Sequence, residues 1–292
     1  MTPFEYRPAE SLEHGLELLA EYGDDARPIA GGTALVNLMR QRLVQPAVLV
    51  GLRGLGRDPR LGGVTRQAEG SLWLGALATH TAVATSATVQ EGWPLVATAF
   101  RRVATPRIRN IATVGGSLAH ADPSQDPPAA LLALDAEVVV ASPDGQRRIP
   151  LDEFFLDYYE TVLKPGELVV GCTIPAVPSG SGWAYQKFLP RTEDDYATVA
   201  VAAWVRLDDA GVCRAARIAL VGAAPRPVRA PAAEAALVGQ RPAEAAIAEA
   251  AELAKDVADP LDDWRGSASH KRRMVGVFTR RALDEAFERA RL

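Results

Sequence analysis

Hydrophobic positions along the N-terminal part follow helical and strand-like spacings in short segments. Leu12, Leu16 and Leu19 recur at helical spacing between Ser11 and Gly23, which predicts a capped amphipathic helix over residues 11–22. Short apolar runs predict strands at residues 26–30 and 47–50, and hairpins that pair 64–65 with 72–76 and 137–141 with 147–150. Helices are expected from Thr79 to about Ala87 and from Pro94 to about Val103.

The C-terminal part separates into strands followed by helices. After the Pro/Gly/Ser-rich stretch 175–182, apolar runs predict strands at 183–189, 197–207 and 213–221. Helices are predicted at 232–237, 242–257 and about 267–291. We therefore expect an α+β protein with a boundary near residue 176 and a C-terminal domain built on a three-stranded antiparallel sheet. The sequence has no GxGxxG motif to favour a doubly wound dinucleotide-binding fold.

Composition narrows the class of protein. The 292 residues are 48% hydrophobic, enough for a large core and roughly two domains. A net charge of -4 gives no basic footprint for nucleic acid. The N-terminal residues 1–6 lack the features of a leader, and no run of about 18 apolar residues occurs. The expectation is a soluble, cytoplasmic protein without a transmembrane segment.

Cysteine and histidine content argues against a metal centre in this chain. Cys172 and Cys213 lie in strand-like surroundings without CxxC spacing, which favours buried free thiols. An iron-sulfur cluster typically takes four thiolates. The four histidines show no HxxxH or HExxH spacing. If the protein transfers electrons, its metal centres are expected on partner chains.

Two glycine doublets stand where apolar runs end, in Ala30-Gly31-Gly32-Thr33 and in Thr113-Val114-Gly115-Gly116-Ser117. Glycine lets backbone N–H groups approach an anion closely, so the two segments could grip one diphosphate. The first doublet opens a helix-like stretch over residues 34–40, whose dipole would favour the same anion. The second sits in a polar segment, 107–128, that reads as a long loop, and long ordered loops are usually functional. Either doublet alone is also compatible with a simple tight turn.

Together these motifs resemble those of the FAD subunit of molybdenum hydroxylases, the medium subunit of the carbon monoxide dehydrogenase and xanthine dehydrogenase family. The resemblance includes the order and spacing of the motifs and continues nearly to the C-terminus. It implies a bilobed FAD-binding domain of the vanillyl-alcohol-oxidase (PCMH) type over 1–176, with sub-lobes of about 1–55 and 56–176, and a smaller C-terminal domain over 177–292. It further implies an iron-sulfur small subunit and a molybdopterin large subunit as partners, assembled as a dimer of heterotrimers. FAD is the one cofactor implied for this chain.

The resemblance also assigns residues to the cofactor. Backbone N–H groups of Gly31, Gly32 and Thr33 would bind one phosphate, and those of Gly115, Gly116 and Ser117 the other, with a hydroxyl from Thr113. Asp126 would accept hydrogen bonds from ribose or ribityl hydroxyls. In the segment 187–197, Lys187 would place positive charge near the flavin, Tyr196 would cover one ring face and Asp194 would affect access of the acceptor. The remaining candidate FAD contacts are Ile29, Ala30, Ala34, Leu35 and His120.

Several alternatives stay open at this level. Ser117 stands where many family members have asparagine, which leaves only its backbone contact expected. His120 could instead cap its loop, and the 187–197 segment could be an ordinary charged hairpin turn. A stand-alone flavin oxidoreductase, or a scaffold of the same fold without FAD, are the competing functions. No nucleophile and base constellation is apparent, so no catalytic side chain is assigned. The substrate of the complex and its acceptor, whether NAD, a quinone or oxygen, are not encoded in these motifs.

Overall fold

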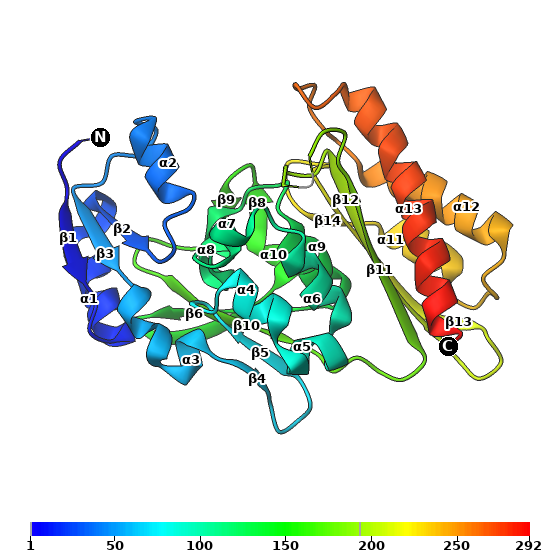
Figure 1. Cartoon of the computed structure of the whole chain (residues 1–292), viewed down its shortest axis with the longest axis horizontal. Coiled ribbons are helices and arrows are strands. Elements are labelled where there is room, and N and C mark those ends of the chain that lie inside the picture. Colours follow the sequence, from blue (N-terminus) through cyan, green and yellow to red (C-terminus); the bar gives the residue numbers. More distant parts are fainter. Residues whose placement is uncertain (1, 193) are drawn as a thin grey trace.

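Four β-sheets organise the chain in the computed structural model, which describes residues 2–192 and 194–292. The sheets follow one another along the long axis of the molecule, from the blue N-terminal strands to the yellow and red C-terminal part (Figure 1). Helices and strands are thus mixed in the N-terminal part, whereas helices follow strands in the C-terminal part, as an α+β fold requires.

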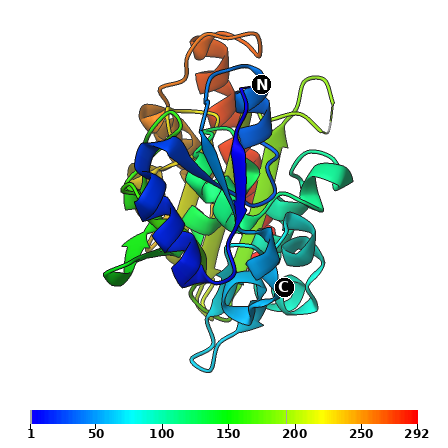
Figure 2. The ribbon, with the colours of Figure 1, turned by 90° about the vertical axis from the view of Figure 1, so that its left-hand side faces the viewer.

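The first sheet is parallel, in the order β1-β3-β2. Its strands are β1 (Glu5–Pro8), β2 (Ala26–Ile29) and β3 (Val48–Gly51), and the intervening helix is α1 (Leu12–Tyr22). Figure 2 looks onto this end of the molecule, with α1 beside the strands. Ser11 caps α1 by accepting from the His14 N–H, and Gly23 ends it at φ +50°. The predicted helix and the two predicted strands are confirmed.

The second sheet is five-stranded, antiparallel and central, in the order β4-β5-β10-β6-β7. Both predicted hairpins form part of it, as β4 (Val64–Arg66) with β5 (Leu72–Gly75) and β6 (Glu137–Ser142) with β7 (Gly145–Pro150). The middle strand, β10 (Leu168–Ile174), was not recognised in the sequence. A separate two-stranded hairpin consists of β8 (Phe155–Asp157) and β9 (Glu160–Thr161).

Short helices pack around the central sheet. Thr79 caps α4, as predicted, but the helix ends at Thr85 and a new helix begins at Ala87. The full set comprises α2 (Leu35–Arg40), α3 (Pro59–Gly62), α4 (His80–Thr85), α5 (Ala87–Gly92), α6 (Pro94–Arg101), α7 (Pro106–Arg109), α8 (Val114–His120), α9 (Asp126–Ala133) and α10 (Leu151–Phe154), with 3-10 turns at Gly23–Asp25 and Arg53–Arg57.

The C-terminal sheet corrects the expectation of three strands. The long strands β11 (Ser181–Phe188), β12 (Val199–Leu207) and β13 (Cys213–Val221) are joined by a fourth, β14 (Val228–Arg229). A strand of two residues is too short to show an alternating pattern, which is why the sequence did not reveal it. The helices are α11 (Pro231–Leu237), α12 (Glu244–Leu253) and α13 (Ala268–Ala290), with a 3-10 turn at Ala254–Val257.

Strand β12 shows how the C-terminal sheet is held on both faces. Its alternate residues Val199, Val201, Ala203, Val205 and Leu207 belong to the core formed with α11, α12 and α13. Ala200 and Ala202 face the other way and join the core of the N-terminal part. Helix α9 packs on that second face and is buried at all eight residues. Consequently one helix of the N-terminal part also serves as a cover for the C-terminal sheet.

Cys172 and Cys213 are both free and buried, as expected. Burial raises the pKa of the Cys172 thiol to about 12, so it stays protonated at neutral pH. Within the described residues, no helix is both long and apolar enough to cross a membrane. A cytoplasmic location stays a prediction.

His80 is a buried polar residue that the sequence did not single out. It is 2% exposed, its ring meets Phe100 edge-on, and its backbone N–H donates to Ala112 O at 3.0 Å. Neither ring nitrogen has a partner within the described part of the chain. Burial lowers its pKa to about 4, with the nearby Arg109 charge acting in the same direction.

We expect His80 to make the fold acid-sensitive. Its pKa is about 4 when folded and about 6.5 when unfolded, so the unfolded chain takes up the proton first as pH falls. Stability is unaffected above about pH 6.5 and is lost between about pH 6.5 and 4, by roughly 2–3 kcal/mol at the lower end. Urea titrations at pH 7 and 4.5 should show His80→Leu losing less stability than wild type by about this amount. His14→Gln, at a partly exposed site, should lose as much as wild type; equal losses in all three would contradict the assignment.

Candidate functional site

The first glycine doublet forms a loop of unpartnered backbone donors. It follows β2 and leads into α2, and Gly32 takes φ +71°, a conformation that favours glycine. In the described part of the chain, the N–H groups of Gly31, Gly32, Thr33 and Ala34 have no hydrogen-bond acceptor. All four residues are partly exposed. Such a run of free N–H groups suits an anionic ligand.

This loop touches the segment that precedes the second doublet. A Cβ at Gly31 would lie 1.9 Å from Ile111 O and 3.1 Å from Ala112 Cα, so the two backbones meet where no side chain fits. Ile29 packs against the loop, since its Cδ1 would lie 3.3 Å from a Cβ at Gly32. The two glycine motifs, about 80 residues apart in sequence, are therefore neighbours.

The second doublet is helical, which corrects the expectation of a long loop over 107–128. Thr105 caps α7 and Thr113 caps α8, and α9 begins at Asp126. Gly115 N–H donates to Ala76 O at 2.8 Å, Gly116 N–H to Thr113 Oγ1 at 3.2 Å and Ser117 N–H to Thr113 O at 2.9 Å. These donors have acceptors within the chain, and the predicted phosphate contact through them stays a prediction. Gly116 is exposed and lacks a Cβ, which leaves this face of α8 open to close approach.

The end of α8 leads toward the C-terminal part. Ser117 Oγ is bound to Gln125 Oε1, and Gln125 Nε2 donates to Ser117 O at 2.9 Å. His120 lies in the last turn of α8, and its ring centroid is 5.3 Å from that of Tyr159. Burial lowers the pKa of His120, so the imidazole is neutral at pH 7. Tyr159 in turn donates to Asp122 Oδ2 at 3.3 Å.

Asp126 and Lys187 form a buried ion pair between α9 and β11. Lys187 Nζ lies 2.9 Å from Asp126 Oδ2 and 3.0 Å from Arg102 O, and Tyr185 OH donates to Asp126 Oδ1 at 2.5 Å. The two side chains are 4% and 0% exposed. Burial raises the pKa of Asp126, although Lys187 and Tyr185 oppose the shift. The pair joins two candidate residues, but both are directed at partners within the chain, which differs from the separate contacts expected with ribityl hydroxyls and the flavin.

Tyr196 lies where the 187–197 segment meets the loop before α13. Tyr196 is 47% exposed, and the Arg265 guanidinium lies 5.7 Å from the centroid of its ring. The guanidinium groups of Arg265 and Arg191 also lie 4.4 and 4.3 Å from the centroid of the Trp264 ring. Asp194 is exposed, and Glu193 of the same segment lies outside the described residues. The structure therefore gives Tyr196 an accessible ring face, as a flavin neighbour would need.

Sequence reasoning missed four residues that connect these features. They are Gln125, Tyr159, Tyr185 and Arg265. Gln125 could have been noticed as a polar residue just before a buried helix. Tyr185 pairs with Asp126 across 59 positions of sequence, and no local pattern reports such a contact.

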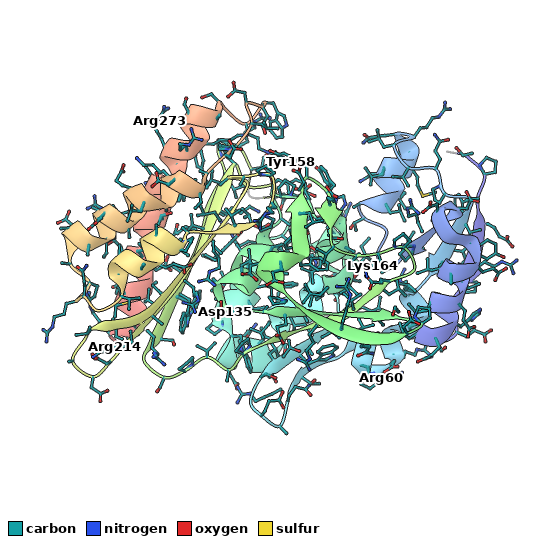
Figure 3. The ribbon with its side chains drawn as sticks, turned by 180° about the vertical axis from the view of Figure 1, so that it is seen from behind. Arg60, Asp135, Tyr158, Lys164, Arg214 and Arg273 are labelled. Carbon is teal, nitrogen blue, oxygen red and sulfur yellow. The ribbon has the colours of Figure 1, made fainter. Side chains whose placement is uncertain are left out.

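Breaking the buried pair should be far more destabilising than breaking an exposed one. Lys187→Met leaves the Asp126 carboxylate buried without its cation, and we expect the free energy of unfolding to fall by about 3–5 kcal/mol. Guanidinium titration should show part of that loss recovered in the double variant Asp126→Asn/Lys187→Met. Arg60→Met is the matched control, because it breaks the exposed pair with Asp58 (Figure 3 labels Arg60) and should cost far less than Lys187→Met. Equal losses from Lys187→Met and Arg60→Met would argue against a structural role for the buried pair.

Comparison with known proteins agrees with this geometry over the whole chain. Residues 2–177 match the family described as FAD binding domain in molybdopterin dehydrogenase, and residues 183–286 match the CO dehydrogenase flavoprotein C-terminal domain. The chain is 39% identical to the alpha subunit of the 6-hydroxypseudooxynicotine dehydrogenase complex of Paenarthrobacter nicotinovorans, over 99% of this chain and 96% of that one. It is 36% identical to the carbon monoxide dehydrogenase medium chain of Hydrogenophaga pseudoflava, over 98% of each.

Solved structures extend the agreement to three dimensions. A chain of carbon monoxide dehydrogenase from Hydrogenophaga pseudoflava superposes with a TM-score of 0.94 at 38% identity, covering 99% of this chain and 98% of that chain. Sequence identity, domain content and fold thus indicate the same family. The chain belongs to the family of FAD-binding medium subunits of molybdenum hydroxylases, together with those of carbon monoxide dehydrogenase and xanthine dehydrogenase.

Proposed function

We propose that this chain carries FAD between an iron-sulfur subunit, from which it takes electrons, and an external acceptor. When bound, FAD supplies the exchange between one-electron carriers and two-electron acceptors. Support comes from family membership and from the loop of unpartnered N–H groups at Gly31 to Ala34. That loop is the single observation that carries the site, because consecutive free donors beside a close backbone contact suit a diphosphate.

Different residues of the chain would then contact different parts of FAD. Backbone N–H groups of Gly31, Gly32 and Thr33, with the Thr33 hydroxyl, hold the diphosphate, and Ile29, Ala30, Ala34 and Leu35 shape that loop. Thr113, Gly115 and Ser117 hold α8 in place, and Gly116 leaves its open face to the cofactor. His120 and Tyr196 lie toward the flavin ring.

In this proposal Asp126 and Lys187 support the site by holding the segment before α7 in position. Lys187 Nζ binds the carbonyl of Arg102, which lies just before the turn that leads into α7. Through this bond the ammonium fixes the segment that approaches the second glycine motif. Its positive charge also lies in a dry environment, where the Asp126 carboxylate balances it.

The partners belong to the same proposal. We assign the iron-sulfur clusters to a small subunit and molybdopterin to a large subunit, assembled as a dimer of heterotrimers. Support comes from the two cysteines of this chain, too few for one cluster. We also place the domain boundary near residue 176, with sub-lobes of about 1–55 and 56–176, in line with the short connection between β10 and β11.

We expect the purified chain to contain FAD, and expect Gly31→Ala to lose it. A methyl group at Gly31 would lie 1.9 Å from Ile111 O, so the loop must shift and its donors are displaced. Acid release and chromatography of the chromophore should show occupancy at least about tenfold lower than in wild type, equivalent to about 1.4 kcal/mol or more in binding. The control is Gly54→Ala, which meets nothing within 4 Å.

Two outcomes contradict the assignment. A folded wild-type chain that is colourless and takes up no added FAD would remove the cofactor from the proposal. Full occupancy in a folded Gly31→Ala variant would place the diphosphate elsewhere. Co-purification tests the partners separately, because a chain that oxidises its own organic substrate without other subunits would be a stand-alone flavin oxidoreductase.

A further inference from the structure

A short backbone ladder holds the segment before the second glycine motif against the turn that leads into α4. Its bonds join His80 N to Ala112 O and Val114 N to Ala78 O, each at 3.0 Å, around an antiparallel bridge between Thr79 and Thr113. The first glycine loop rests on the same segment, because a Cβ at Gly31 would lie 1.9 Å from Ile111 O. The ladder therefore fixes the backbone against which the proposed FAD loop is placed.

The side chain of His80 lies where this ladder meets the helices around it. Its ring packs edge-on against Phe100 of α6, and α4, α6 and α7 lie together in the middle of Figure 1. Neither ring nitrogen has a hydrogen-bond partner in the described part of the chain, although both are buried. A leucine would fill such a site without leaving polar atoms unsatisfied, so the imidazole is suited to a role that depends on its proton.

The charged groups around α4 do not stabilise a protonated ring. On the helices packed against α4, the charged residues that are exposed to solvent are Glu91, Arg101 and Arg107. Residues 110–115 carry no charge, so Arg109 of α7 is the group whose field acts on the ring. Its guanidinium is held in place because it donates to Val103 O and Ala104 O. Burial, and to a smaller extent this cation, lower the pKa of His80 to about 4.

Protonation of His80 requires the ladder to open. A charged imidazole needs water or a hydrogen-bond acceptor, and within the described residues the buried ring has no acceptor. Opening breaks the bond from the His80 N–H to Ala112 O and moves residues 109–114 away from α4. Ile111 moves with them, so Gly31 loses the backbone on which it rests. Local openings of this kind take less free energy than global unfolding.

We propose that His80 is a positioning residue that makes the retention of FAD depend on pH. The neutral ring keeps residues 109–114 closed on the core, and the protonated ring holds them open, which lets the first glycine loop release its ligand. The inference rests on the proposed function, since that ligand is FAD. It goes beyond the acid sensitivity of the whole fold, because the opening is confined to the ladder and the glycine loop. Release of the cofactor then precedes unfolding as pH falls.

The dissociation rate of FAD tests the inference. The FAD-loaded protein as purified is diluted at about pH 7.5 or about pH 5, and free FAD is measured after rapid desalting at timed intervals. In the open state the ring has its ordinary pKa of about 6.5, so proton uptake raises the population of that state roughly thirtyfold between the two pH values. We expect wild type to release FAD at least about tenfold faster at the lower pH, while circular dichroism shows that the chain remains folded.

Two variants and one control isolate the imidazole. His80→Leu fills the site without a titrating group, and His80→Gln keeps a polar side chain, so one remains informative if the other does not fold. Each should release FAD at rates that differ by less than about threefold between the two pH values, because no proton is taken up at this position. His14→Gln, on α1, should respond to pH as wild type does.

Equal release rates of wild type at both pH values overturn the inference. The same acid response in wild type and in the His80 variants also overturns it, because the proton then acts elsewhere, for example on the phosphates of FAD. Loss of the circular dichroism signal together with FAD overturns a local opening. A purified protein that takes up no FAD at either pH overturns the proposed function itself, and the role of His80 with it.

Discussion

The burial of helix α9 between two cores is the constraint on which the rest of the structure depends. All eight of its residues are buried, and Leu131 and Leu132 each contribute roughly 2 kcal/mol of hydrophobic stabilisation. One side packs against the helices around the central sheet, and the other covers the face of β12 and β13 that is turned toward the N-terminal part. Its first residue, Asp126, carries the charge that fixes Lys187 of β11. Just after the end of α9, Asp135 forms ion pairs with Arg217 and Arg229 (Figure 3 labels Asp135).

Backbone contacts then position α8 and the first glycine loop relative to α9. Segment 121–125 connects α9 directly to α8, and α8 is tied to the β5–α4 turn by Gly115 N–H and by the bond from Val114 N–H to Ala78 O at 3.0 Å. The Ile111 and Ala112 backbone that precedes α8 is the surface against which Gly31 rests. At Gly31 and Gly115 the neighbouring segment lies too close for a Cβ, so backbone contacts take the place of side-chain contacts. These contacts connect the position of the glycine loops to the core.

Most long, regular elements were predictable from the sequence, with the exception of β10, and contacts between distant residues were not. Helix α1 and strand β12 show clear periodicity and a recognisable boundary, and α13 follows a capping serine. Helices α7 and α8 have four and seven residues, too few for a period, so they read as loop. The glycine motifs were found as motifs, but which of their N–H groups are free depends on Ala76 and Thr113, whose positions only the fold determines. The pairing of Asp126 with Lys187 likewise arises from packing.

The free N–H groups of the first glycine loop are separate from the contacts that hold the fold together. Both cores, the buried ion pair and the contact between the glycine motifs are complete with residues of this chain alone. The unpartnered donors lie in a partly exposed loop, where water satisfies them. The sequence of this loop is therefore constrained by what the loop binds, whereas the sequence of the two cores is constrained by packing.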